Sequence, residues 1–79
     1  MSRTTSRRQF RVLTRMRGGY DGATMHDVQL QIAATGALVW AQTFTDQQQA
    51  EEFEQQVEDD LDHLVPEDFR SKYGVPSTA

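Results

Sequence analysis

Two histidines are the residues of this sequence with the most reactive neighbours. His26 stands beside Asp27 and near Asp21, and His63 follows Asp59 by four positions, one turn of a helix. An imidazole next to a carboxylate can transfer a proton or hold a metal ion. We interpret both as solvent-exposed, His26 in a loop and His63 on the polar side of a helix. The chain also has no cysteine. We therefore expect a protein that is not an enzyme, with no catalytic residue, no metal site and no cofactor.

The charged residues are separated along the chain. Residues 1–17 contain six arginines and no acid, whereas residues 18–69 contain all 12 acids and neither Lys nor Arg. Arg70 and Lys72 bring the net charge to −4. Such asymmetry bears on partners and solubility. It favours a binding function over catalysis.

Carboxylates crowd one predicted helix, and five of them are Glu54, Glu58, Asp59, Asp60 and Asp62. Three of these follow one another at spacings of four, which costs about 0.2–0.5 kcal/mol for each like-charged pair. Asp59 and Asp60 also lie near the helix C-terminus, where cations are favoured. Either Arg70 and Lys72 fold back to neutralise this face, or the face binds a basic partner.

Hydrophobic periodicity predicts the strands that must position these groups. Residues 10–17 alternate apolar and basic, and the glycine-rich stretch after them predicts a loop to about His26. Residues 27–34 alternate again, and Thr35 and Gly36 form a short turn before the apolar segment 37–44. Two strands joined by so short a turn are antiparallel.

Helical spacing begins after the third strand. Thr45 or Asp46 can cap a helix over residues 46–64, whose apolar positions form one stripe: Ala50, Phe53, Val57, Leu61 and Leu64. Pro66 suits the first turn of a second helix, and Gly74 suits its end. A short C-terminal helix is therefore expected.

The predicted fold class is α+β. A three-stranded antiparallel β-meander carries one amphipathic helix on one face, in the order β-β-β-α, followed by the short C-terminal helix. We expect a flexible basic tail over residues 1–8, a single domain over 9–74 and a C-terminal tail over 75–79. No apolar run reaches the roughly 18 residues of a membrane span. Together with the absence of cysteine, this favours a cytoplasmic protein without a membrane partner.

One face of the sheet is left for binding. If the helix covers Trp40 and Leu38, alternation places Leu13, Val39 and Ala41 on the other face among glutamines and arginines. This small apolar patch with a polar rim is typical of a weak interface. The segment 37–44 also lacks charged residues, and we expect it to form an edge strand of the sheet. The leading hypothesis is a protein-interaction module that self-associates through the open face or this edge.

Two alternatives use charge. In the first, the arginine-rich tail and first strand bind nucleic acid, with Arg11, Arg15 and Arg17 on phosphates. In the second, Asp59 and Asp60 belong to an acidic helix that imitates nucleic acid for a basic protein. The negative charge of the middle of the chain opposes the first alternative.

The passage from Gly36 through Thr43, Phe44 and Thr45 to Ala50, Glu51 and Phe53 resembles the strand-turn-helix passage of small DNA-binding domains found at the start of some phage-type integrases. That resemblance implies a sheet laid in the DNA major groove. It covers fewer than a third of the residues. Here the second and third strands offer no Lys or Arg to meet phosphates, so the resemblance is one of architecture.

Overall fold

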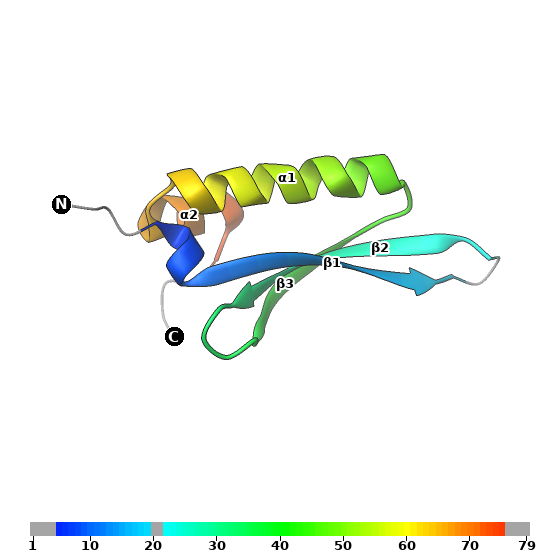
Figure 1. Ribbon diagram of the computed structural model, residues 1–79, viewed down its shortest axis with the longest axis horizontal. Helices are drawn as coiled ribbons and strands as arrows, with labels where there is room; N and C mark the ends of the chain where they lie inside the picture. Colours follow the sequence, from blue (N-terminus) through cyan, green and yellow to red (C-terminus); the bar gives the residue numbers. More distant parts are fainter. Residues whose placement is uncertain (1–4, 20–21, 76–79) are drawn as a thin grey trace.

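A three-stranded sheet carries a long helix and a short helix in the computed structural model, which describes residues 5–19 and 22–75 (Figure 1). The elements are the 3-10 helix η1 (Ser6–Arg8), the strands β1 (Phe10–Gly18), β2 (Thr24–Ile32) and β3 (Leu38–Phe44), and the helices α1 (Gln47–His63) and α2 (Pro66–Tyr73). The strands are antiparallel in the order β1-β2-β3. The predicted α+β meander with two helices is confirmed.

The β1–β2 hairpin is longer than predicted. Pairing runs from Phe10 opposite Ile32 to Gly18 opposite Thr24, so β2 begins three residues before Asp27. In Figure 1 this hairpin projects past the first turn of α1 as a two-stranded arm. His26 therefore lies inside β2, where its side chain is 6% exposed, and the prediction of a loop histidine is wrong.

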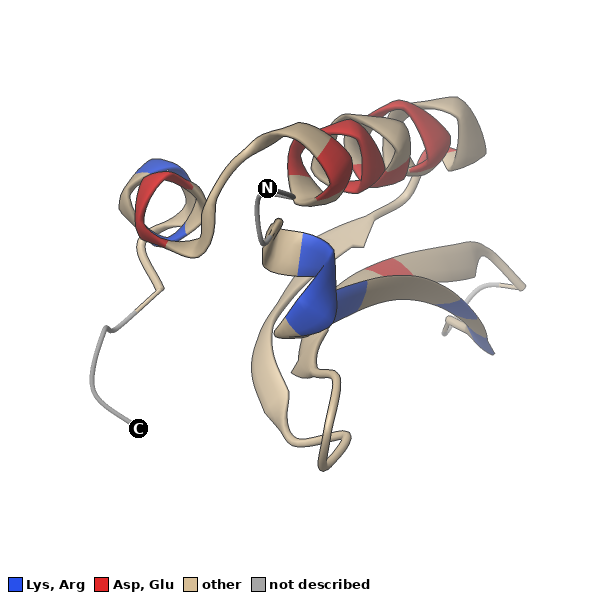
Figure 2. Ribbon diagram, turned by 60° about the vertical axis from the view of Figure 1, so that its left-hand side comes forward, with Lys and Arg blue, Asp and Glu red and all other residues tan. Residues whose placement is uncertain are grey.

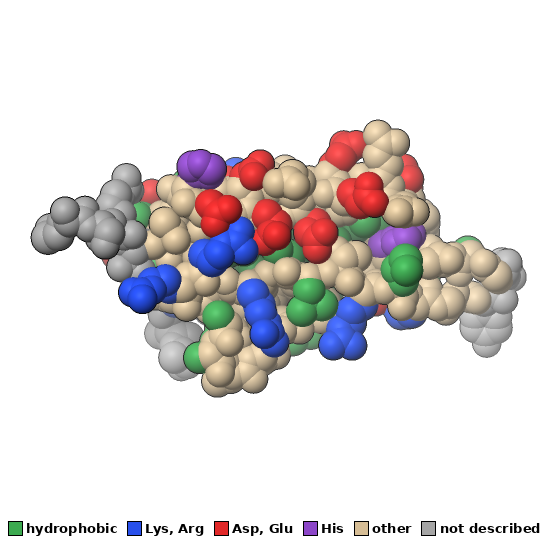
Figure 3. Space-filling view, in the orientation of Figure 1, with side chains coloured by type: hydrophobic (Ala, Val, Ile, Leu, Met, Phe, Trp, Pro, Cys, Tyr) green, Lys and Arg blue, Asp and Glu red, His purple; other side chains and the backbone are tan. Residues whose placement is uncertain are grey.

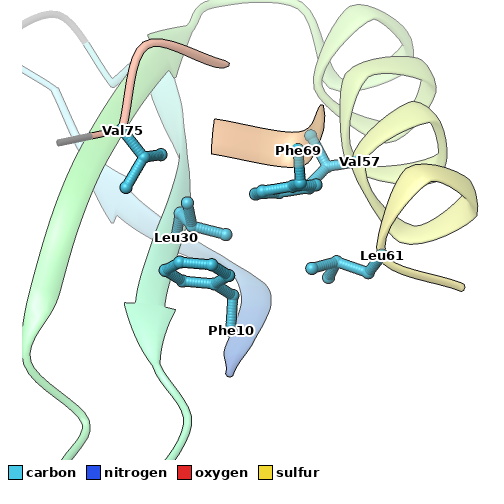
Figure 4. Packing of buried hydrophobic residues seen from close by; sticks show 6 residues of the cluster. All are labelled: Phe10, Leu30, Val57, Leu61, Phe69 and Val75. Atoms are coloured by element: carbon cyan, nitrogen blue, oxygen red, sulfur yellow. The ribbon is translucent and has the colours of Figure 1, made fainter. Parts of the chain in front are cut away.

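The core lies at the opposite end of the sheet. Six buried side chains from β1, β2, α1, α2 and the segment after α2 meet there (Figure 4): Phe10, Leu30, Val57, Leu61, Phe69 and Val75. The rings of Phe10 and Phe69 stack with their centroids 5.4 Å apart. Close packing of a few large side chains thus joins α1, α2 and the segment after α2 to the sheet.

The helix boundaries follow the predicted signals. The Asp46 carboxylate accepts a hydrogen bond from the Gln48 amide at 3.1 Å and caps α1. Pro66 occupies the first turn of α2, and Gly74 ends it with φ of 66°, a conformation that glycine adopts without steric cost. No helix within residues 5–19 and 22–75 is long and apolar enough to cross a membrane.

Two residues predicted to lie in the terminal tails, Ser6 and Val75, pack against the domain. Ser6 is fully buried, and its amide and hydroxyl both donate to the Leu64 carbonyl, at 3.0 and 2.9 Å. These bonds hold η1 against the end of α1, so residues 5–8 belong to the domain. Val75 packs in the core, which extends the domain by one residue. The rest of the two predicted tails, residues 1–4 and 76–79, lies outside the described residues.

A β-bulge changes which side chains of β3 face the core. Leu30 pairs with Trp40, but the next residue, Gln31, pairs with Leu38. Strict alternation fails where one strand carries an extra residue. As a result Leu38 is 58% exposed and Val39 packs against the core. The predicted placement of Val39 on the open face, and of Leu38 beneath the helix, is wrong.

The packing makes a prediction about stability. Phe69→Ala should lower the free energy of unfolding by about 3–5 kcal/mol, because it removes a fully buried ring stacked on Phe10. Leu38→Ala, at an exposed position, should change it by less than about 0.5 kcal/mol. Urea denaturation followed by circular dichroism measures both. If Phe69→Ala does not fold, Phe69→Leu provides a smaller loss. Equal midpoints for the variants at 69 and 38 would contradict this account of the core.

Candidate interaction surfaces

Arg7 neutralises the acidic end of α1. Its Nε donates to Asp62 Oδ1 at 2.5 Å, and its two terminal nitrogens donate to the Glu58 carboxylate and carbonyl at 3.0 and 3.1 Å. The hydrogen bond from Arg7 lowers the pKa of the Asp62 carboxyl, and the bond to Asp62 raises the pKa of Arg7. Glu54 has a partner too, since it accepts from the Thr14 hydroxyl at 2.8 Å. Each of the three like charges on this side of α1 is thereby hydrogen-bonded.

Of the two cations expected to fold back on α1, Lys72 does so and Arg70 does not. Lys72 Nζ lies 2.7 Å from Asp60 Oδ2. Arg70 instead donates to Gln9 Oε1 at 2.9 Å and lies over the Phe10 ring, 5.4 Å from its centroid. Arg70 therefore joins α2 to the start of β1 and leaves the acidic helix to Arg7 and Lys72.

Acidic and basic groups are also paired on the open face of the sheet. Arg17 Nε donates to Asp27 Oδ2 at 2.7 Å, and the Thr43 hydroxyl donates to Asp27 Oδ1 at 2.7 Å. These two hydrogen bonds, first that from Thr43 and then that from Arg17, lower the pKa of Asp27. Arg11 Nε donates to the Gln31 side chain at 2.9 Å. The open face is thus a network of polar groups across three strands.

The residues predicted to bind partners do not form one site. Arg11, Arg15 and Arg17 share the open-face side of β1, and Leu13 and Ala41 flank Gln29 in one row of that face. Figure 3 shows basic side chains below a row of acidic ones that follows α1, and Figure 2 places the two charges on neighbouring elements. Acidic and basic groups that are separated along the sequence therefore lie on neighbouring elements, and two of the arginines, Arg7 and Arg17, are paired with carboxylates.

Asp59 and Asp60 project in different directions from α1. Asp59 is exposed, and its Oδ1 accepts a hydrogen bond from the side-chain Nε2 of Gln55 at 3.0 Å. Asp60 lies on the side of α2, where Lys72 and the Tyr73 hydroxyl both reach it. Partial burial opposes ionisation of Asp60, but the hydrogen bonds from Lys72 and Tyr73 outweigh it and lower its pKa. The two aspartates do not make a continuous acidic patch.

The two histidines lie in different elements, His26 in β2 and His63 at the end of α1. His26 faces the helix side of the sheet opposite Met16 and Phe44. His63 is exposed as predicted, with Nδ1 2.7 Å from the Asp59 carbonyl oxygen. Within the described part of the chain, no three His, Cys, Asp or Glu side chains are grouped so that they could hold a metal ion.

An aromatic groove runs along the outer edge of β3, and sequence reasoning missed it. The groove encloses about 560 Å³ and is lined by Trp40, Ala41, Gln42, Phe53, Lys72, Tyr73 and Gly74. The Trp40 ring centroid lies 5.7 Å from that of Phe53 and 6.1 Å from that of Tyr73. The buried Trp40 Nε1 finds no acceptor among the described residues. Because the rings come from β3, α1 and α2, only the packing of the helices brings them together.

The charges on the groove rim cancel. The Tyr73 hydroxyl donates to Asp60 Oδ2 at 2.5 Å, and Lys72 pairs with the same carboxylate oxygen. Burial, followed by the hydrogen bond to Asp60, raises the pKa of Tyr73 to about 12. Tyr73 therefore stays neutral at physiological pH. The groove therefore has an aromatic base, and the charges of Lys72 and Asp60 at its rim add to zero.

The two edges of the sheet differ in charge. The β1 edge carries three arginines on the open face, Arg11, Arg15 and Arg17, whereas β3 from Leu38 to Phe44 has no charged residue and no proline. Charged side chains and prolines are the usual means of blocking an edge strand. Among the described residues, no backbone group outside the sheet bonds to β3. Within residues 5–19 and 22–75, the β3 edge is therefore open for pairing.

Comparison with protein-family models, curated proteins and solved structures gave no match for this chain. Function must therefore be argued from the surfaces themselves. An open, uncharged strand beside an aromatic groove can add a further strand and accommodate side chains of that strand. We call the outer edge of β3 together with this groove the β3 site.

The Arg7 contacts predict a pH-dependent loss of stability. Arg7→Gln should lower the urea midpoint at neutral pH, because Glu58 and Asp62 lose their partner, while Arg8→Gln should leave it nearly unchanged. Asp62 has a lowered pKa, so its contribution is present above the ordinary pKa of 3.8 and is lost as pH falls through the lower value of the folded state. The difference between wild type and Arg7→Gln should therefore shrink on acidification. A difference that stays constant down to low pH would contradict the ion-pair account.

Tyr73 should ionise unusually late. A spectrophotometric titration of the folded chain should contain a phenolate component near pH 12, and Tyr73→Phe should lack it. Since folding raises this pKa from 10.0 to about 12, the corresponding stability is complete below pH 10 and is lost as pH rises toward 12. Absence of the late component from wild type would contradict the burial of Tyr73 and its hydrogen bond to Asp60.

Proposed function

We propose that this protein is a non-enzymatic protein-interaction module that binds an extended polypeptide segment at the β3 site. The observation that carries the proposal is the coincidence of two features at one edge of the sheet. β3 offers a seven-residue strand without charge, and its Trp40 ring lines a groove together with the rings of Phe53 and Tyr73 from the helices. Neither feature is present at the β1 edge.

Binding would follow the ordinary pattern of strand addition. The incoming backbone would hydrogen-bond to the outer amides and carbonyls of β3, and every second side chain would point toward the groove. Tyr and Trp side chains give large contact area at a low cost in conformational entropy. An apolar or aromatic side chain at alternate positions of the segment therefore suits this site best.

The two charge-based functions have less support. Arg7 and Arg17 have carboxylate partners, and Figure 3 shows basic side chains next to the acidic row of α1. Phosphates approaching β1 would therefore meet carboxylates as well as guanidinium groups. Asp60 is paired with Lys72, which reduces the charge that an acidic helix could offer to a basic protein. We retain the β3 site as the single proposed surface.

The test uses a random library of displayed peptides long enough to span β3, selected on the immobilised full chain. Selected peptides should carry apolar residues at alternate positions. When titrated into the ¹⁵N-labelled chain, they should shift the amide signals of β3 and of Phe53 and Tyr73.

The row that contains Gln29 offers a matched pair of variants. Ala41→Lys adds charge to the β3 edge, and Leu13→Lys adds the same charge to the β1 edge of that row. The first variant should weaken peptide binding about tenfold or more, and the second should not. Shifts confined to β1 or to the exposed side of α1, or equal losses in both variants, would overturn the proposal.

A further inference from the structure

The partner at the β3 site can be identified by considering charge. Resting on the function proposed above, we infer that the segment that pairs with β3 is β3 of a second copy of this chain. The two strands run antiparallel across a two-fold axis perpendicular to the sheet. The result is a dimer with one continuous six-stranded sheet.

Self-pairing requires a surface that does not repel itself. In a two-fold contact both copies use the same patch. A patch whose charges all have one sign would therefore face like charges on the other copy and be repelled. Along the β1 edge, copies would bring arginines together, and along α1 they would bring carboxylates together (Figure 3). The β3 site has no net charge, because β3 is uncharged and Lys72 is paired with Asp60. Of the surfaces described above, the β3 site is the one that two copies can share without repulsion between like charges.

The opposite edge of the sheet makes the assembly finite. After two β3 strands pair, both outer edges of the joined sheet are β1 strands. These edges carry Arg11, Arg15 and Arg17 on the open face, which oppose addition of another copy. The contact therefore closes at a dimer and does not propagate into a fibre.

The two-fold arrangement also covers the groove. A rotation about an axis perpendicular to the sheet keeps the helices of both copies on the same face. The two grooves then lie next to each other, and Trp40, Phe53 and Tyr73 of one copy approach those of the other. Burial of these aromatic surfaces supplies the hydrophobic gain of association. Gln42, which is exposed and lines the groove, adds a side chain that can both donate and accept hydrogen bonds.

Sedimentation equilibrium of the full chain over a range of concentrations tests the inference. Wild type should be a dimer, and Ala41→Lys should raise the dissociation constant about tenfold or more through like-charge repulsion across the axis. Leu13→Lys should remain a dimer, because Leu13 occupies the same row on the other edge. If two copies stacked through their open faces, both substitutions would weaken the dimer equally, which would overturn the inference. If Ala41→Lys does not fold, as checked by circular dichroism, Gln42→Lys replaces it.

Mixing two variants distinguishes a second copy from any other partner. Ala41→Glu alone should be as monomeric as Ala41→Lys, but an equimolar mixture should form a heterodimer, because opposite charges then face each other across the axis. A monomeric mixture would overturn self-pairing.

The peptide selection keeps the two proposals separable. A wild-type chain that is monomeric throughout, and whose selected peptides still map to β3, would overturn the inference and leave the proposed function standing. A monomer whose peptides do not map to β3 would overturn both.

Discussion

The structure depends on the packing of a few large apolar side chains at one end of the sheet. Phe10, Leu30 and Phe69 are buried there beneath the last turns of α1. A chain of this length can bury only about 60% of the surface of its unfolded state, so these contacts cannot be spread along the whole sheet. The core instead brings the first and last described segments to the same place, with η1 against α1 and the segment after α2 against Leu30. The remaining edges and the hairpin arm extend beyond it.

The placement of the core determines where the charges go. Because η1 lies against the end of α1, Arg7 reaches Glu58 and Asp62, and the crowded carboxylates gain a partner from 51 residues or more away in sequence. Docking of α2 brings Lys72 to Asp60 in the same way. Such exposed pairs contribute little stability individually. Their larger consequence is that basic side chains lie against part of the acidic surface of α1, which weakens its attraction for a basic macromolecule.

The same placement leaves the β3 site uncovered. α1 and α2 provide Phe53 and Tyr73 at its wall. Among the described residues, no backbone group outside the sheet bonds to β3, and Lys72 at the rim is paired with Asp60. An apolar, neutral edge next to stacked rings is costly to leave in water. This cost is the physical reason for the pairing proposed above, and the arginine-bearing opposite edge would limit that pairing to one partner.

Local sequence determined the architecture of this protein, because strand alternation, helix spacing and capping residues act over a few positions. The order of the strands, the Asp46 cap, the apolar stripe from Ala50 to Leu61 and the Gly74 stop could be read from the chain, whereas the length of the β1–β2 hairpin could not. The side of the sheet taken by Leu38 and Val39 could not, because a bulge depends on how two strands pair. Likewise, the partners of Arg7 and the groove at Trp40 were decided only by tertiary packing, which joins residues from separate elements at distances that no periodicity encodes.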